Sequence, residues 1–235
     1  MKMLVSDYDD TFYIKDEDIK RNIDLVKLFM KNNFFTIATG RSYFDFKKKK
    51  DLYGIEYNYL IINHGATIIR NNDVIYNMPI DNSVKNELIK DLKLEKTISN
   101  FVCSELDSRV SLDNDNLTKI HVRYNTKDEA KEINELLIKK YLGKINSFLV
   151  CKDEAIEIVA SEVNKSNAIR FIAKIQNIID DNIYTIGDSY SDIEMIENFN
   201  GYCMTNSIKE LKEIAIKEVD SVSDLINEVM RDSNE

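Results

Sequence analysis

Cysteine is scarce in this chain of 235 residues, and its pattern excludes a disulfide framework. The three cysteines, Cys103, Cys151 and Cys203, are odd in number, widely spaced and without the pairing of a metal site. The chain also lacks an apolar run long enough to span a bilayer, and its opening apolar stretch is too short for a secretory signal. We therefore expect a soluble protein of the reducing cytoplasm.

An excess of positive charge is absent as well. The 32 lysines and arginines are outnumbered by 41 aspartates and glutamates, which gives a formal net charge of −9 and a pI near 5.0. Such a balance argues against nucleic acid or an anionic membrane as the main partner. A small anionic substrate would need a local basic pocket that offsets the repulsion from the negative net charge of the protein.

The single proline marks a change in the organisation of the chain. Strands and helices alternate before Pro79 and again after Val163, whereas the segment between them has the order α-β-β-β-α-β-β. This pattern predicts an α/β fold with a doubly wound, mainly parallel sheet and an inserted α+β lid. We expect the core to comprise residues 1–80 and 163–235, and the lid residues 81–162.

Two details of this prediction can be checked directly. Within the lid, we expect strands near residues 98–104, 109–112 and 117–124. After a last core strand over residues 201–204, we expect one or two helices to end the chain.

Polar residues follow four of the predicted core strands. Because parallel strands end at one edge of a sheet, where ligands bind in open α/β folds, these residues should converge. Three of only six glycines also fall there, where the backbone must turn or approach a ligand closely. The residues are Asp7 and Asp9, Thr39 and Gly40, Asn63 and Gly65, and Gly187, Asp188 and Asp192.

Each motif taken alone has an ordinary alternative. Asp7-Tyr8-Asp9-Asp10 is also typical of an acidic turn, Thr39-Gly40-Arg41 of a helix cap, and Gly187-Asp188-Ser189 of a plain turn. Lys165 alone would be a surface lysine. Their joint occurrence, each at a strand–helix junction, favours a ligand site.

Together these motifs resemble those of the haloacid dehalogenase-like (HAD) phosphatases. The matching residues are Asp7-Tyr8-Asp9-Asp10-Thr11, Thr39-Gly40-Arg41, Lys165 and Gly187-Asp188-Ser189-Tyr190-Ser191-Asp192. The long lid between the second and third motifs is similar to the type-two cap of the Cof-type, class IIB sugar-phosphatase group, whose core is Rossmann-like. Asn63-His64-Gly65-Ala66 resembles that group's turn after the third strand.

Three positions depart from the group's pattern. Asp10 and Ser166 stand where glycine is usual, and Ser191 stands where asparagine is usual. None of these departures removes a catalytic group, but they weaken an assignment of substrate by analogy.

The resemblance implies hydrolysis of a phosphate monoester with Mg²⁺. Asp7 would be the nucleophile that forms an aspartyl-phosphate, and Asp9 would protonate the leaving oxygen and later accept a proton from water. The Mg²⁺ ligands would be the Asp7 carboxylate, the Asp9 backbone carbonyl and Asp188, with Asp192 acting through water or as a supporting partner. The phosphoryl oxygens would be held by Thr39, Gly40 and Lys165.

Residues beside these motifs and in the lid are candidates for contact with the rest of the substrate. In the lid strand over residues 117–124, alternation places Lys119, His121 and Arg123 on one face and apolar side chains on the other. If the basic face meets the core, it could bind a second anionic group of the substrate. The alternative is an ordinary solvated sheet face. Arg41, Asn63 and Ser191 are further candidates, with a structural role as the alternative.

Two other functions fit the same motifs. A phosphomutase or phosphotransferase would pass the aspartyl-phosphate to a sugar hydroxyl instead of water. A signalling or binding module would use a phosphorylatable aspartate without turnover, although the paired acids and the large lid argue against it. Among substrates, the sequence leaves open sugar phosphates, phosphoglycolate-like acids and cofactor phosphates, because the lid decides among them.

Overall fold

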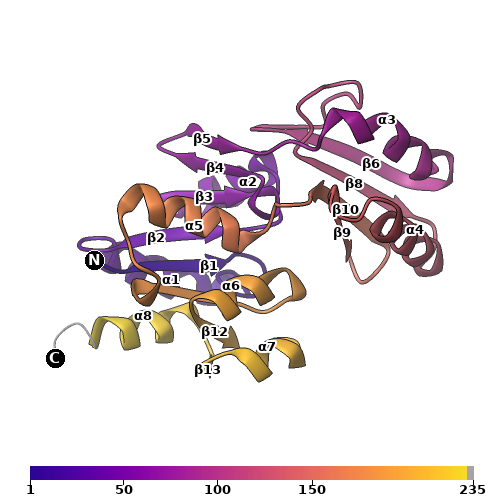
Figure 1. Cartoon of the computed structure of the whole chain (residues 1–235). Coiled ribbons are helices and arrows are strands. Elements are labelled where there is room, and N and C mark those ends of the chain that lie inside the picture. Colours follow the sequence, from indigo (N-terminus) through magenta and orange to yellow (C-terminus); the bar gives the residue numbers. More distant parts are fainter. Residues whose placement is uncertain (232–235) are drawn as a thin grey trace.

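The computed structural model describes residues 1–231 and places two β-sheets side by side (Figure 1). The larger sheet has eight strands and the smaller one five. In spatial order the larger sheet contains β13 (Lys217–Val219), β12 (Asn200–Met204), β11 (Ile183–Gly187), β1 (Met3–Asp7), β2 (Phe34–Ala38), β3 (Tyr59–Ile62), β4 (Thr67–Arg70) and β5 (Asp73–Asn77). Neighbours from β13 to β3 pair in parallel, and the hairpin β4–β5 adds an antiparallel edge.

Helices cover both faces of the larger sheet. Side chains alternate along β1, so Leu4 packs on one face whereas Met3 and Val5 pack on the other. A parallel sheet that is buried on both faces needs such continuous apolar strands. The Leu4 face carries α1 (Asp16–Phe29), α2 (Tyr43–Tyr53) and α8 (Val222–Arg231), and the opposite face carries α5 (Lys165–Gln176), α6 (Ile193–Asn198) and α7 (Lys209–Ile214). The predicted doubly wound core is therefore confirmed.

The smaller sheet is antiparallel and forms a separate layer pair with two helices. Its strands, in spatial order, are β7 (Asp107–Ser108), β6 (Thr97–Ser104), β8 (Lys119–Tyr124), β10 (Ala155–Ala160) and β9 (Ile145–Val150), and its helices are α3 (Asn82–Asp91) and α4 (Lys127–Lys140). Ile120, Val122 and Tyr124 of β8 pack against both helices, as the alternation predicted. The opposite face of this sheet is free to meet the core.

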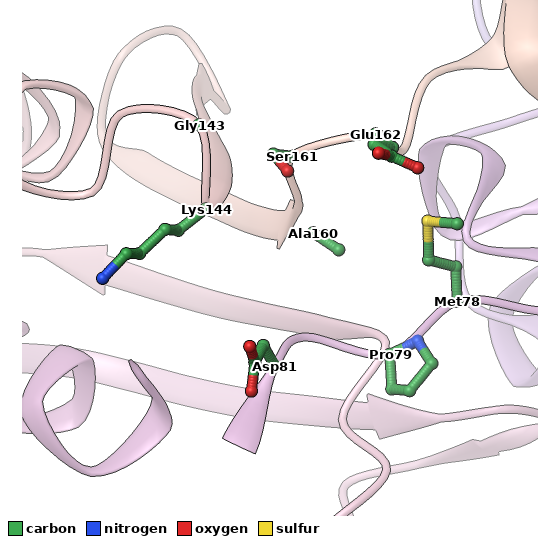
Figure 2. Close-up of a pocket in the computed structure, with 8 residues that line it drawn as sticks. All are labelled: Met78, Pro79, Asp81, Gly143, Lys144, Ala160, Ser161 and Glu162. Atoms are coloured by element: carbon green, nitrogen blue, oxygen red, sulfur yellow. The ribbon is translucent and has the colours of Figure 1, made fainter. Parts of the chain in front are cut away.

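All elements of the smaller sheet, with α3 and α4, lie between Asn82 and Ala160, inside the expected lid of residues 81–162. We call this part the cap and the larger sheet with its helices the core; the domain bounds themselves stay a prediction. Where the chain crosses between the two parts, a cavity of about 270 Å³ opens (Figure 2). Its wall is mixed in character: Met78, Pro79, Asp81, Gly143, Lys144, Ala160, Ser161 and Glu162.

Two expectations about secondary structure are wrong. No strand forms over residues 109–112; instead a loop follows the two-residue strand β7, and the buried Lys85 ammonium binds the backbone carbonyls of Asp113 and Asn114 in that loop. The edge strand β13 was not expected, because three residues with mostly exposed, charged side chains carry no alternation signal. Within residues 1–231, no helix combines the length and apolar character needed to cross a bilayer.

Gly65 brings the turn after β3 against the start of α5. It ends the 3-10 turn Asn63–Gly65 (η1) with φ +115°, a region that L side chains rarely adopt. A Cβ atom here would lie 2.3 Å from the carbonyl oxygen of Asn164. Asn164 caps α5 by accepting a hydrogen bond from the backbone N–H of Asn167. This close approach therefore fixes the place of the N-terminus of α5 beside the turn after β3. Lys165 is the first residue of α5.

We expect Gly65→Ala to destabilise the protein by roughly 2–3 kcal/mol or more, because backbone strain adds to a clash with main-chain atoms. Gly54→Ala is the matched control, since Gly54 also has a positive φ but nothing lies within 4 Å of its Cβ position. That control should cost only about 1 kcal/mol. Urea denaturation of both variants measures the difference, and equal costs would contradict the close approach.

Candidate active site

The carboxyl ends of β1, β2, β3 and β11 lie next to one another in the core and face the cap. A cavity of about 660 Å³ opens between the two parts at this edge. The core contributes Asp7, Asp9, Thr39, Gly40, Arg41, Asp188 and Ser191 to its wall, and the cap contributes Phe101, Lys119, His121, Phe148 and Glu157. The structure thus brings together most of the residues that the sequence marked as candidates.

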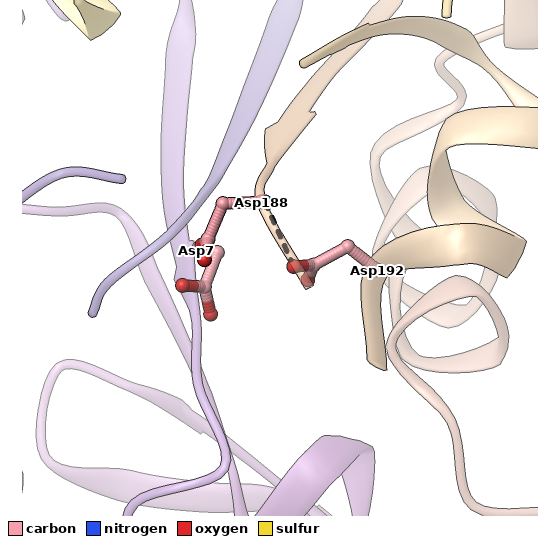
Figure 3. A group of neighbouring side chains, drawn as sticks. All are labelled: Asp7, Asp188 and Asp192. Carbon is pink, nitrogen blue, oxygen red and sulfur yellow. Dashed lines mark hydrogen bonds between the residues drawn. The ribbon is translucent and has the colours of Figure 1, made fainter. Parts of the chain in front are cut away.

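Three aspartates lie close together at the carboxyl ends of β1 and β11 (Figure 3). Asp7 ends β1, Asp188 follows β11, and Asp192 ends the 3-10 turn Tyr190–Asp192 (η4). One carboxylate oxygen of each lies within 4.8 Å of the others. Burial raises the pKa of Asp7, with the charges of Asp192 and Asp188 adding to it against the opposing effect of Lys165. Burial likewise raises the pKa of Asp188, to about 6.

Lys165 lies between two of these acids. Its ammonium donates to Asp7 Oδ1 at 2.5 Å and to Asp192 Oδ1 at 2.6 Å, and its side chain is 1% exposed. Burial alone would lower the pKa of Lys165, but the carboxylates of Asp192 and Asp7 raise it above its usual value. A charged ammonium therefore offsets part of the repulsion within the cluster.

Asp192 has no carboxylate oxygen left unpaired. Its Oδ1 binds Lys165, while its Oδ2 accepts hydrogen bonds from the backbone N–H groups of Asp188 and Ser189 at 3.1 and 3.0 Å and from the Ser189 hydroxyl at 3.0 Å. Gly187 makes room for this, because a Cβ atom there would lie 2.5 Å from Asp192 Cγ. The geometry suits Asp192 as a support for Lys165 and for the Asp188 loop.

This cluster fits a divalent cation of the Mg²⁺ type. Such an ion prefers hard oxygen ligands and usually takes only one or two carboxylates from the protein. Burial, together with neighbouring acids, raises the pKa values of Asp7 and Asp188, and a divalent cation bound to their oxygens would stabilise both carboxylates in the ionised form.

Thr11 is a further site residue, and the sequence assigned it no role. Its hydroxyl donates to Asp188 Oδ1 at 2.7 Å, and its side chain is fully buried. The hydrogen bond opposes the rise in the pKa of Asp188 and orients one of its oxygens. The only available signal was its place at the end of the Asp7–Thr11 motif.

Asp9 lies beside Asp7 but is bound to Arg41. The guanidinium donates from Nε to Asp9 Oδ2 at 2.8 Å and from Nη2 to Oδ1 at 2.7 Å, and it lies over the ring of Tyr8 at 5.6 Å. Arg41 thus meets an acid of the first motif in this structure. A bidentate pair of this kind holds the Asp9 carboxylate in one orientation.

The Thr39–Gly40 segment forms one wall, and the turn after β3 supports it. The hydroxyl of Thr39 accepts a hydrogen bond from the Arg41 N–H at 3.1 Å, which leaves the hydroxyl proton available to a ligand oxygen. The backbone N–H groups of His64 and Asn63 donate to the carbonyls of Thr39 and Arg41 at 3.1 and 3.0 Å. We call residues 39–41 the phosphate-loop candidate.

Two predicted substrate contacts do not line the cavity. Asn63 is fully buried and donates from its side-chain amide to the Thr118 hydroxyl at 3.3 Å, so it joins core to cap. Arg123 pairs with Glu154 at the exposed end of β8, away from the wall. Ser191 does line the cavity, where its hydroxyl meets that of Ser189 at 3.0 Å.

The basic face of β8 meets the core, but it is not simply basic. Glu157, opposite His121 on β10, is bound by both Lys119 and His121, at 2.9 and 3.0 Å. The charge of Lys119 is therefore balanced within the cap, so this face is less basic than the alternation along β8 alone indicates. The sequence reasoning missed Glu157, although a single acid inside the apolar run of residues 155–160 was a visible signal.

Comparison with known proteins agrees with this geometry. A family model described as haloacid dehalogenase-like hydrolase matches residues 4–155 and 103–226. The chain belongs to this family. The resemblance found in the motifs, to HAD-like hydrolases of the Cof type, is confirmed.

Two relatives of this hydrolase match most of the chain. A protein of Buchnera aphidicola named “Putative phosphatase” is 25% identical over 86% of this chain and 88% of its own length. An uncharacterised protein of Mycoplasma capricolum is 28% identical over 84% of this chain and 88% of its own.

Two solved structures show the same fold. A haloacid dehalogenase-like hydrolase from B. subtilis has a TM-score of 0.81 at 17% identity, with 97% of this hydrolase and 99% of that chain covered. A sugar phosphatase of HAD subclass IIB has a TM-score of 0.76 at 18% identity, with 97% and 98% covered.

We expect Asp188→Asn to raise the free energy of unfolding of the metal-free hydrolase at pH 7 by on the order of 1 kcal/mol. Folding raises the pKa of Asp188 to about 6, so its ionisation destabilises the folded state as the pH rises through that value. Asparagine removes the charge but still accepts from Thr11.

Urea denaturation in EDTA measures the effect, with the exposed Asp24→Asn as control. The gain should shrink as the pH falls from about 6 towards 3.8, the ordinary pKa of the carboxyl, and vanish below it, where Asp188 is protonated in both the folded and the unfolded state. Lower stability of Asp188→Asn at pH 7 would contradict the cost of burying the Asp188 charge.

Proposed function

We propose that this hydrolase is a Mg²⁺-dependent phosphatase of a small phosphorylated metabolite. The observation that carries the proposal is the placement of Asp7 at one end of the cavity, with its Oδ1 bound by Lys165 and the phosphate-loop candidate beside it. A buried carboxylate held by an ammonium is suited to nucleophilic attack on phosphorus. The subclass IIB sugar phosphatase with the same fold supports a sugar phosphate or similar monoester as substrate.

In the first step, the free oxygen of Asp7 would form a bond to phosphorus while the bond to the leaving oxygen breaks. Thr39 (hydroxyl), Gly40 (N–H) and Lys165 (ammonium) would hold the phosphoryl oxygens, over which charge spreads in the transition state. When bound by Asp7, Asp188 and the Asp9 carbonyl, Mg²⁺ supplies further neutralisation of that charge.

Asp9 would move the protons. It would donate one to the leaving oxygen, then accept one from the water that attacks the phosphorus and releases Asp7 and inorganic phosphate. Because Arg41 binds both oxygens of Asp9 here, Asp9 would turn from Arg41 towards the leaving oxygen when substrate enters. The Asp9 side chain is 44% exposed, which gives it room to rotate.

We expect Asp7→Asn to abolish release of inorganic phosphate from 4-nitrophenyl phosphate, because the amide cannot act as nucleophile. EDTA should abolish the wild-type activity, and added Mg²⁺ should restore it. The exposed Asp24→Asn is the matched control and should keep full activity. Full activity of Asp7→Asn would overturn the mechanism, and transfer of phosphate to an added sugar without its release would identify a phosphotransferase instead.

We expect Asp9→Asn to lose more activity on an alkyl phosphate than on 4-nitrophenyl phosphate. An alkoxide leaves only if it is protonated, whereas nitrophenolate leaves without help, so the loss should be roughly 10²-fold or more for the alkyl ester and much smaller for the aryl ester. Steady-state kcat on both esters measures the difference. An equal loss on both would exclude Asp9 as the general acid.

A further inference from the structure

Glu157 is a buried carboxylate that the proposed mechanism does not use. It lies on β10 of the cap with 8% of its surface exposed. Its Oε1 accepts from Lys119 Nζ at 2.9 Å and meets His121 Nδ1 at 3.0 Å, and its Oε2 meets His64 Nε2 at 2.5 Å. A carboxylate is buried at tolerable cost only with such partners, and His64 belongs to the core. The cluster thus spans both parts of the protein.

Lys119 connects Glu157 to the phosphate-loop candidate. Besides Glu157, its ammonium donates to the backbone carbonyl of Gly40 at 2.6 Å, and its side chain is 2% exposed. In a trans peptide the C=O and the following N–H point in opposite directions. Fixing the Gly40 carbonyl therefore aims the Arg41 N–H away from Lys119, and that N–H donates to the Thr39 hydroxyl at 3.1 Å.

His64 supports the same loop from the core. A Cβ atom on Gly40 would lie 2.5 Å from His64 Cε1, so the imidazole ring lies directly against the glycine. Burial lowers the pKa of His64, so the ring is neutral and the charge of Glu157 is met by Lys119. Gly40 is therefore held between a core imidazole and a cap ammonium, both bound to Glu157.

We propose that Glu157 is a positioning residue for the phosphate-loop candidate. Through Lys119 it orients the Gly40–Arg41 peptide, and the Arg41 N–H in turn orients the Thr39 hydroxyl. This inference rests on the proposed phosphatase function, in which residues 39–41 hold the phosphoryl oxygens. It assigns the cap a part in building the phosphate site, in addition to lining the cavity. Lys119 and Glu157 then act as one unit and not as contacts to the leaving group.

The test uses Glu157→Gln, Lys119→Met and the double variant, with Glu154→Gln on the exposed side of the cap as matched control. Because misplacing a phosphate donor weakens transition-state binding whatever the leaving group, kcat/KM should fall by about tenfold or more, by the same factor for 4-nitrophenyl and alkyl phosphates. The double variant should lose no more than either single variant, since the residues act together. Glu154→Gln should match the wild type.

Affinity for inorganic phosphate, measured by titration calorimetry with Mg²⁺, gives a readout without turnover and should fall in all three variants. Removing one partner leaves a buried charge, so the double variant, which removes both, keeps the test valid if a single variant fails to fold. Unchanged phosphate affinity in a folded double variant, or a loss that depends on the leaving group, would overturn the positioning role. Absence of wild-type turnover with phosphate affinity lost in the variants would instead refute the phosphatase function alone.

Discussion

The site depends on one buried ammonium shared by two buried carboxylates. Lys165 begins α5, while Asp7 ends β1 and Asp192 follows β11, so three distant parts of the chain meet at one nitrogen. An isolated carboxylate at that depth would be too costly to keep ionised, and three of them would repel one another. The position of α5 is therefore a constraint on the chemistry, and the contact between Gly65 and Asn164 sets that position.

A second buried ion pair repeats this principle at the cap. Lys119 and Glu157 neutralise each other in the cavity wall, and Lys119 also donates to the carbonyl of Gly40. Buried pairs contribute little net stability, but they fix geometry, because moving either partner exposes an uncompensated charge. Lys165 holds Asp7, and Lys119 borders residues 39–41 beside it. Core and cap are thus joined by electrostatics at the site as well as by the chain crossings.

Two of the three departures from the family pattern, Asp10 and Ser191, have local structural explanations. Asp10 has φ +56°, a conformation that glycine adopts freely and that aspartate tolerates better than most residues. The Ser191 hydroxyl pairs with Ser189, which itself binds Asp192, so it remains within the network of the fourth motif. Ser166 is buried beside Lys165, and its hydroxyl finds no partner among the described residues.

The sequence by itself determined the core fold and the edge at which the acids meet. Alternating strands and helices predict a parallel sheet, and parallel strands end on one side, so Asp7, Thr39 and Asp188 had to converge. The local pattern of apolar residues did not predict β13 and wrongly predicted a strand at residues 109–112, because such short or irregular segments carry no reliable periodicity. Only the tertiary structure decided which partner each charge takes. Arg41 binding Asp9, Thr11 binding Asp188 and Glu157 meeting His64 are contacts across the fold, and side-chain alternation fixes the face of a residue but not what lies opposite.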